Sequence, residues 1–500
     1  MPKPKLLREY DDIIEAALQR AEDLGVYLVL RINDNYQYSM RWKQRSIADS
    51  SIDTSVGVGL YTFTPKGYLA FGSTNELTIE SIEKLVTDTS EVAKANEAVR
   101  ADRAPEVYDL SFQENLGEDD LHYNVVDVSD IPQQELANLA GTMEDYLHKA
   151  NKSIKPYIRY SIHQSQWRII RSDGTDVDFA IPYAIGVFGF TIEKNGSQAN
   201  GYVPYYMPTP QQLLSKADDI RSKLTEELSR ASDQLTAKPA TAGNFPIIIT
   251  DKLAGLLVHE ALGHPTESDA IAENGSVLGD EKNMFRTGQQ VAARGVTVTD
   301  HEEGLSHGFN PYGAFGNKRE KVTIIEDGIL RESISDIFTA QKTGVLNKNA
   351  ERSEHYGQVA IPRMSTTYLQ LKEDMILEKS LPSSSPADVQ KLLKRHGIFD
   401  KYKRIYYLIG SGGGQVSTKT GDFMFGSHYT YELSDEGALA TKPVSFSGNV
   451  LEALKSIEFG VGKLAKEGAG ICGKNGQSVY VNDGGHELIL FRKTKHVSIA

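Results

Sequence analysis

The chain has 500 residues, of which 40% are hydrophobic and 9% aromatic, which is enough to bury a sizeable core and excludes wholesale disorder. Its 54 lysines and arginines stand against 67 aspartates and glutamates, and a net charge of −13 does not favour nucleic acid as a partner. A single cysteine, Cys472, excludes an intrachain disulfide and fits a reducing compartment. The charged N-terminus is no signal peptide, and no apolar run reaches the ~20 residues of a membrane span. These features predict a cytoplasmic protein with no membrane and no nucleic-acid partner.

The first half of the chain alternates helical and strand patterns. Apolar residues recur at helical spacing over residues 5–24, and Gly25 then suits a helix C-terminus. Segments rich in β-branched and aromatic residues, separated by turn residues, predict strands. The predicted strands are 26–32, 36–42, 56–64, 67–72, 157–162, 167–171 and 183–192, and the further helices are 77–99, 132–149 and 209–235. The polar stretch 101–120 is typical of a linker or a long loop. The first half is therefore predicted to be a mixed α/β domain.

A domain boundary is predicted at residues 236–244, where the sequence becomes small, polar and rich in Pro and Gly. It divides the chain into domains 1–240 and 241–500. The second half reads as a short buried strand, a helix over 251–263, and then mostly strands and turns. Its predicted hairpins are 320–333 and 478–491, its strand into a glycine run is 404–416, and its brief helices are 386–396 and 450–459. The predicted class is α+β, with a β-rich second domain that carries one important helix.

That helix ends in His259-Glu260-Ala261-Leu262-Gly263-His264, and two histidines with a glutamate beside the first suggest a metal hydrolase. The spacing is unusual, because histidines four apart lie about 40° apart around an α-helix, whereas these, five apart, lie about 140° apart. Gly263 can adopt the left-handed conformation that ends a helix, and Pro265 favours an extended His264. The sequence therefore predicts that His264 lies just beyond the helix end and folds back towards His259.

Other interpretations of these residues remain open. His259 could be a core histidine and His264 a helix cap. Glu267 and Asp269, just past the second histidine, could orient a ligand or could be exposed loop carboxylates. A second motif of the same residue types, His301 to His307, lies among Gly, Asn and Pro with no helix to hold it, and a solvated loop is expected there.

A third metal ligand is expected, because two neutral imidazoles are too few for tight zinc binding and a catalytic site leaves its fourth position to water. Cys472 is the best remaining soft ligand, and its glycine-rich surroundings, residues 468–477, let the backbone approach an ion closely. The competing interpretation is that a lone cysteine is a small buried hydrophobe.

A second glycine run, Gly410 to Val416, follows a predicted strand. It lacks the Gly-Lys-Ser/Thr ending of a phosphate-binding loop, and no helix pattern follows it. Its glycines fit better as backbone that lines a cleft and pairs with an extended peptide.

Three blocks, HEALGH, GGGQVSTKTGDF and GICGKNGQ, resemble the TldD/PmbA family of metallopeptidases in their order and spacing, and the resemblance covers essentially the whole chain. It implies an N-terminal α/β domain and a barrel-like C-terminal domain, zinc ligands His259, His264 and Cys472, and Glu260 as general base. The family pairs a catalytic TldD-like subunit with a partner that lacks the metal motif, and this chain resembles the catalytic subunit. It departs from better-known members after the second histidine, where it has Pro265-Thr266-Glu267 in place of Gly-Leu-Glu.

The predicted function is that of a zinc-dependent peptidase that hydrolyses unfolded or extended peptides. Zinc would activate a water molecule, and Glu260 would move its proton to the leaving amine. The alternatives are a binding or scaffold protein with a structural zinc site and a metal-dependent amidase that acts on small molecules. The expected partners are peptide substrates and a second subunit, in a homodimer or in a heterodimer with a PmbA/TldE-like paralogue.

Overall fold

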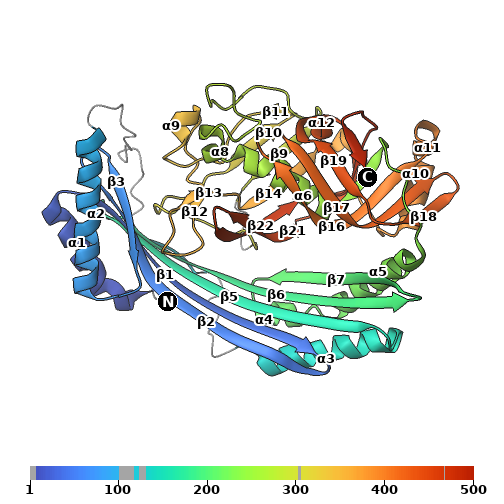
Figure 1. Cartoon of the computed structure of the whole chain (residues 1–500), viewed down its shortest axis with the longest axis horizontal. Helices are drawn as coiled ribbons and strands as arrows, with labels where there is room; N and C mark the ends of the chain where they lie inside the picture. Colours follow the sequence, from blue (N-terminus) through green and yellow to red (C-terminus); the bar gives the residue numbers. More distant parts are fainter. Residues whose placement is uncertain (1–6, 101–117, 123–130, 302–305, 467) are drawn as a thin grey trace.

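The computed structural model describes residues 7–100, 118–122, 131–301, 306–466 and 468–500, so most of the predicted linker at 101–120 lies outside the described residues. A long, curved sheet of seven strands forms the first half (Figure 1). Its strand order is β3-β2-β1-β5-β6-β4, with β7 paired to β6. The strands are β1 (Tyr27–Lys43), β2 (Ser46–Phe63), β3 (Leu69–Thr74), β4 (Glu118–His122), β5 (Lys155–Arg171), β6 (Asp176–Lys194) and β7 (Ser197–Met207).

Helices cover the two ends of this sheet (Figure 1). Helices α1 (Asp11–Leu24) and α2 (Ile79–Arg100) contact each other and the strands at one end. The other helices are α3 (Gln133–Ala150), α4 (Pro210–Leu214) and α5 (Ala217–Thr236). The predicted end of the first helix is confirmed, because Gly25 follows α1 in the left-handed conformation with φ 65°.

Two pairs of predicted strands form single, continuous strands. Segments 26–32 and 36–42 form the single strand β1, and 157–162 and 167–171 form the single strand β5. The polar residues between them do not turn, because neighbouring strands satisfy them: Nδ2 of the fully buried Asn33 donates to Ser165 Oγ at 3.1 Å and to the carbonyl of Gln166 at 3.1 Å. Tertiary pairing thus overrides the local turn preference.

The second half contains two larger open sheets. One has the order β11-β10-β9-β14-β22-β21, and the other has the order β15-β20-β23-β8-β16-β17-β19-β24, with β18 paired to β17. The predicted α+β class is confirmed, but neither sheet closes into a barrel in the part of the chain that the structure describes. Their strands are β8 (Ile247–Thr250), β9 (Val296–Asp300), β10 (Val322–Glu326), β11 (Ile329–Leu330), β14 (Thr366–Leu371), β15 (Ile376–Glu378), β16 (Ile405–Ser417), β17 (Asp422–Ser434), β18 (Gly437–Thr441), β19 (Ser445–Asn449), β20 (Ile457–Leu464), β21 (Gly468–Lys474), β22 (Gln477–Gly484), β23 (His486–Phe491) and β24 (Val497–Ile499).

Shorter elements complete the second half. The two-residue strands β12 (Glu351–Arg352) and β13 (Ile361–Pro362) pair with each other, and the short helices surround the sheets. These helices are α8 (Ser268–Ala272), α9 (Ala340–Thr343), α10 (Pro386–Arg395), α11 (Ile398–Lys401) and α12 (Val450–Lys455). The predicted hairpin at 320–333 is confirmed as β10–β11. The predicted hairpin at 478–491 is wrong, because β22 and β23 belong to different sheets and the chain crosses between them at Gly484 and Gly485.

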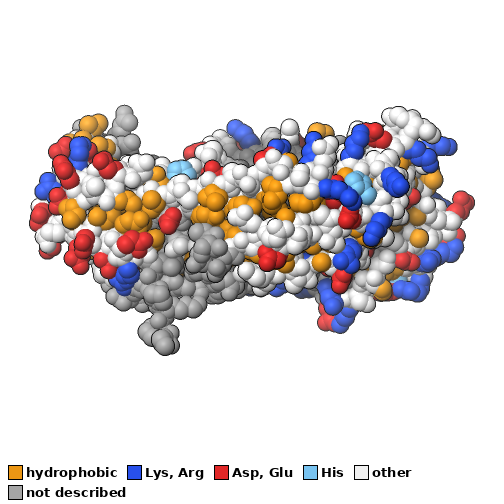
Figure 2. Space-filling view, turned by 90° about the horizontal axis from the view of Figure 1, so that it is seen from below, with side chains coloured by type: hydrophobic (Ala, Val, Ile, Leu, Met, Phe, Trp, Pro, Cys, Tyr) orange, Lys and Arg blue, Asp and Glu red, His pale blue; other side chains and the backbone are white. Residues whose placement is uncertain are grey.

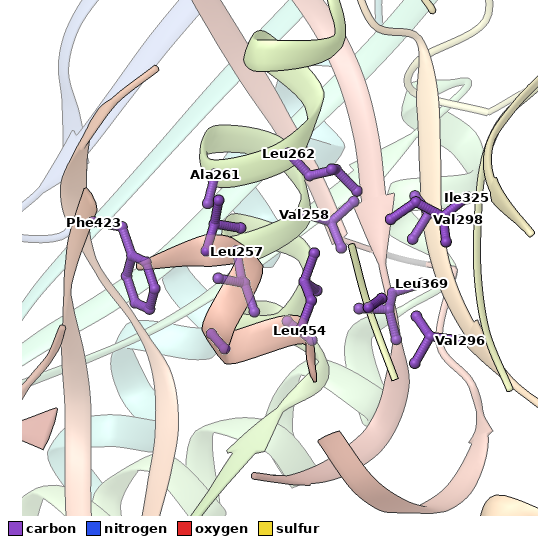
Figure 3. Packing of buried hydrophobic residues seen from close by; sticks show 14 of the residues in the cluster. Leu257, Val258, Ala261, Leu262, Val296, Val298, Ile325, Leu369, Phe423 and Leu454 are labelled. Atoms are coloured by element: carbon purple, nitrogen blue, oxygen red, sulfur yellow. The ribbon is translucent and has the colours of Figure 1, made fainter. Parts of the chain in front are cut away.

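A buried helical segment lies between these two sheets. It begins as α6 (Asp251–Leu256), and its continuation places Leu257, Val258, Ala261 and Leu262 fully inside the core. Figure 3 shows these side chains packed against Val296, Val298, Ile325 and Leu369 of one sheet, and against Phe423 and Leu454 on the other side. Each fully buried aliphatic side chain contributes ~1.5–3 kcal/mol, so this packing fixes the helix firmly.

The two halves share a second core. Apolar residues of the first sheet and of α5 pack with residues of the nine-stranded sheet. Tyr429 Oη donates to Glu227 Oε2 and Tyr431 Oη to Asp233 Oδ2, each at 2.9 Å, which ties β17 to α5. Among the described residues, no helix combines the length and hydropathy that a membrane crossing needs.

Candidate metal centre

The helix that carries both histidines is wound more widely than an α-helix. From Leu257 to Gly263 it is a π-helix, and the short helix α7 (His264–Thr266) follows directly. The backbone N–H of His264 donates to the carbonyl of His259, five residues earlier. An i→i+5 bond places residue i+5 one turn above residue i, so both histidines lie on one face and their ring centroids are 5.0 Å apart.

The predicted route to this arrangement is wrong, although His264 does lie beside His259. Gly263 (φ −58°, ψ −60°) and His264 (φ −56°, ψ −44°) are both right-handed, so the helix does not end between the histidines. Instead, the π-helical turn holds one residue more than an α-helical turn, and this accommodates the spacing of five between the histidines. Gly263 is needed for a different reason, since a Cβ there would lie 1.9 Å from Sδ of the buried Met364.

Cys472 reaches the histidines from strand β21. This strand pairs with β22, with Cys472 opposite Val479, and the cysteine is 1% exposed. Its Sγ lies 3.5 Å from His264 Nε2. One ligand atom from each of His259, His264 and Cys472 lies within 4.8 Å of the others, a spacing that a single ion can bridge.

Each histidine binds a buried carboxylate through its other ring nitrogen. His259 Nδ1 lies 2.9 Å from Asp483 Oδ2, and His264 Nδ1 lies 2.9 Å from Glu267 Oε2. Such partners fix the tautomer and leave Nε2 for a metal. Glu267 is 0% exposed, so the interpretation of it as an exposed loop carboxylate is wrong. The sequence does not mark Asp483 as a site residue, because it sits in the segment predicted as a hairpin and belongs to no motif.

Burial and charge set the protonation of this cluster. Burial lowers the pKa of each histidine, but contacts with Asp483, Glu267 and Cys472 outweigh it and raise the pKa of His259 well above its usual value and that of His264 to about 9. Burial raises the pKa of Cys472, but hydrogen bonds with His259 and His264 lower it to about 6. The pKa of Glu267 is lowered despite burial, chiefly by Lys474 and His264. The metal-free cluster thus favours a thiolate between protonated imidazoles.

Glu260 follows His259 on the π-helix and is half-buried. Its carboxylate forms no hydrogen bond or ion pair with any residue that the structure describes, whereas Glu267 and Asp483 are both engaged. Glu260 is therefore free to accept a proton from a water molecule.

The other sequence motifs lie elsewhere. In the second histidine motif, residues 302–305 lie outside the described residues, and the predicted solvated loop is wrong for His307. This side chain is buried against Tyr183, Tyr206 and Tyr480, and burial lowers its pKa to about 3. The glycine run 410–416 is part of β16, where a bulge interrupts pairing with β17 between Ser411 and Gly414.

A cavity of about 750 Å³ lies between the curved sheet and the β21–β22 hairpin. Alternate residues of β1, β5 and β6 line it, and Ile471 and Tyr480 face it from the hairpin. None of the candidate ligands lines this cavity, because successive residues of a strand point to opposite faces and Cys472 points to the other side of the hairpin from Ile471. The candidate metal centre therefore lies outside this cavity.

Two histidines on one helix, which also carries a glutamate, form with the cysteine opposite a cluster that could hold a metal ion. The sequence profile of the PmbA/TldA metallopeptidase C-terminal domain matches residues 242–473, and that of PmbA/TldA metallopeptidase domain 1 matches residues 28–93. The chain belongs to the TldD/PmbA family of metallopeptidases.

Relatives from archaea support this assignment. A metalloprotease of Methanothermobacter thermautotrophicus is 32% identical over 369 residues, which cover 71% of this chain and 73% of the relative. A metalloprotease of Methanocaldococcus jannaschii is 29% identical over 476 residues, which cover 94% and 96%. A zinc metalloprotease TldD homolog of Saccharolobus solfataricus is 26% identical over 366 residues, which cover 71% and 74%.

Solved structures share the fold at low sequence identity. The crystal structure of TldE from Thermococcus kodakarensis has a TM-score of 0.70 at 13% identity, covering 98% of this chain and 100% of that one. A protein of Bacteroides thetaiotaomicron has a TM-score of 0.72 at 16% identity, covering 99% of each chain. At such identities the similarity establishes the fold alone.

Proposed function

We propose that this chain is a zinc-dependent peptidase in which His259, His264 and Cys472 hold the metal and Glu260 is the general base. The observation that carries the proposal is the buried cluster of three ligand atoms within 4.8 Å. Two imidazoles and a thiolate are a donor set that suits zinc. Membership of a metallopeptidase family supports the reaction class.

The residues around the cluster suit peptide hydrolysis. When bound, zinc supplies a Lewis acid that polarises the scissile carbonyl and acidifies a water molecule. Asp483 and Glu267 hold the two imidazoles with Nε2 turned to the cluster. Glu260 accepts the proton of the attacking water and passes it to the leaving amine.

Three protein ligands favour catalysis over a structural metal site. Structural zinc sites use four protein ligands, whereas catalytic sites leave one position to water. Within the described ranges, the cluster has three members. A scaffold role is therefore less well supported.

Extended peptides are the proposed substrates. Strand β16 contacts the π-helix and pairs with β8 only over Tyr406–Leu408, so its edge beyond Ile409 pairs with no described strand on that side. Residues 412–415 are exposed and rich in glycine. Such an edge can pair with the backbone of an extended chain beside the metal centre.

We also propose a dimer, with a second copy or with a TldE-like paralogue, in the cytoplasm. The structural similarity to TldE of Thermococcus kodakarensis supports a related partner. The edge of β2 from Ser46 to Gly57 pairs with no described strand other than β1, and Ile47 and Ile52 on it are 45% and 58% exposed. The face on which β2 lies carries a band of hydrophobic side chains between charged ends (Figure 2).

Metal content and cleavage products of the purified chain, alone and with a TldE-like paralogue, test these proposals. We expect about one zinc per chain and cleavage of oligopeptides and denatured proteins, with small amides and tightly folded domains left intact. A metal-free active chain would overturn the metal assignment, and equal cleavage of the folded and denatured forms of one protein would overturn the substrate class. Light scattering that shows a fully active monomer would exclude the dimer.

A further inference from the structure

Lys474 is a buried cation beside the candidate metal centre. Its side chain is 15% exposed, and its Nζ donates to Glu267 Oε2 at 2.8 Å, to Asp269 Oδ1 at 2.7 Å and to the carbonyl of Pro362 at 3.4 Å. An ammonium group has three protons, and three acceptors receive them. The position of this side chain is thus determined by the fold.

Glu267 connects Lys474 to a candidate ligand. Its Oε2 is shared between Lys474 and His264 Nδ1, and its Oε1 accepts the backbone N–H of Met364 at 3.3 Å. A carboxylate that is 0% exposed is stable as an anion only beside a cation. Lys474 therefore preserves the acceptor that orients His264.

Lys474 also shares a strand with Cys472. The two residues are two positions apart on β21, so their side chains lie on the same face of the strand. Cys472 reaches the π-helix, and Lys474 reaches the segment just after it. The carbonyl of Cys472 also accepts from Arg363 Nη2 at 2.6 Å. The Lys474 contacts join β21 to the end of the helix, and the Arg363 contact joins it to the segment between β13 and β14, in both cases without any metal.

We propose that Lys474 is a positioning residue of the metal centre: its ion pairs with Glu267 and Asp269 hold β21 against the helix end, so that Cys472 and His264 stand at ligand distance before a metal binds. The inference rests on the proposed metal role of His259, His264 and Cys472. It assigns the link between the strand and the helix to a residue outside the ligand set.

Lys474→Met removes the charge and keeps most of the side-chain volume. We expect zinc affinity, measured by competition with a chelator, to fall about 10-fold or more, as it does when groups that orient ligands are lost. We also expect the thiolate absorption of the cobalt-substituted protein to change, and Cys472 of the metal-free protein to be alkylated faster. Lys474→Arg, which keeps the charge, should show all three effects in weaker form.

Lys348 provides the matched control. It is also buried, with its side chain 9% exposed, and it pairs with Glu320 and Glu332, neither of which contacts a candidate ligand. Lys348→Met should lower the unfolding temperature and leave zinc affinity, the cobalt spectrum and the alkylation rate unchanged. Unchanged zinc affinity and alkylation in Lys474→Met, or equal changes in both methionine variants, would overturn the proposal.

Two further outcomes, a Lys474→Met variant that does not fold and a wild-type chain that binds no zinc, can be distinguished from each other. If Lys474→Met does not fold, Asp269→Asn weakens the same link, and we expect smaller changes in the same direction; no change would count against the proposal. A wild-type chain that binds no zinc would defeat the proposed function. The alkylation comparison uses metal-free protein, so it would still decide whether Lys474 holds β21 in place.

Discussion

Glu260 differs from the two carboxylates that contact the histidines. Asp483 and Glu267 each bind a ring nitrogen, whereas Glu260 is half-buried and forms no hydrogen bond or ion pair among the described residues. Glu260→Gln should therefore retain about one zinc per chain and lose peptide hydrolysis by ~10²–10⁴-fold, the size of a general-base contribution. Metal analysis and peptide-cleavage rates check this. The exposed Glu273 is the control, and Glu273→Gln should behave as wild type. Loss of zinc in Glu260→Gln would contradict the assigned role.

Cys472 contributes the only thiolate that the chain can offer, because it is the single cysteine of the sequence. Cys472→Ser replaces a thiolate by a hydroxyl that holds its proton far more tightly, so zinc affinity should fall about 10-fold or more. Chelator competition measures the loss. In the wild type, the thiol should resist alkylation with metal bound and react once a chelator removes it. Equal labelling with and without metal would mean that the third ligand lies elsewhere.

At the scale of elements, the π-helix depends on the small volume of Gly263. A methyl group there would lie 1.9 Å from Met364 Sδ, and both residues are buried. Gly263→Ala should therefore destabilise the fold by ~1–3 kcal/mol despite the higher helix propensity of alanine. Thermal unfolding measures this, and zinc affinity should fall with it because the histidine face shifts.

Gly141 of α3 is the matched control, because its added methyl group would meet only ordinary contacts with Trp42, the nearest atom at 3.4 Å. Gly141→Ala should be neutral or stabilising. If both alanine variants unfold at the wild-type temperature, the Met364 side chain moves aside at little cost in free energy, and the helix does not depend on Gly263.

Sequence identifies the site residues more readily than the path of the chain between them. His259, His264 and Cys472 are visible because histidine and cysteine are rare in this chain, and Glu260 is visible because it stands directly beside His259. The winding of the helix is not visible, since it results from packing between two sheets and not from local preference. Asp483 is invisible for a related reason: residues 478–491 have the local pattern of a hairpin, and only the tertiary structure places their two strands in different sheets.

At the scale of the whole molecule, the two halves meet around a buried carboxyl group. Glu351 of β12 is 0% exposed, lines the same cavity as Arg31 of β1, and has no side-chain hydrogen-bond partner among the residues that the structure describes. Burial, with a smaller contribution from Asp336, raises the pKa of Glu351 to about 8. The folded state therefore keeps a proton that the unfolded chain releases near pH 4.3, and stability falls as the pH rises from about 4 to about 8.

Glu351→Gln removes this titration. Relative to the wild type, the variant should gain stability between pH 5 and pH 9, by an amount on the order of a few kcal/mol, because glutamine has no proton to lose. Unfolding temperatures of both proteins across that range measure the effect. A constant difference between the two proteins at all pH values would show that Glu351 does not titrate within the folded range.

The π-helix also has a consequence for insertions and deletions. Histidines five residues apart face the same side of a π-helix, just as histidines four residues apart face the same side of an α-helix. At this site the wider winding of the helix therefore compensates for the one additional residue between the histidines. Deletion of one residue between His259 and His264 would let an ordinary α-helix present both histidines on one face. Because the wider turn already absorbs the extra residue, the same deletion would leave the residues after His264 in nearly the same direction, with Glu267 still within reach of the lysine and the backbone amide that bind it. The extra residue and the wide turn are thus expected to be gained or lost together, because either one alone would turn His264 away from His259.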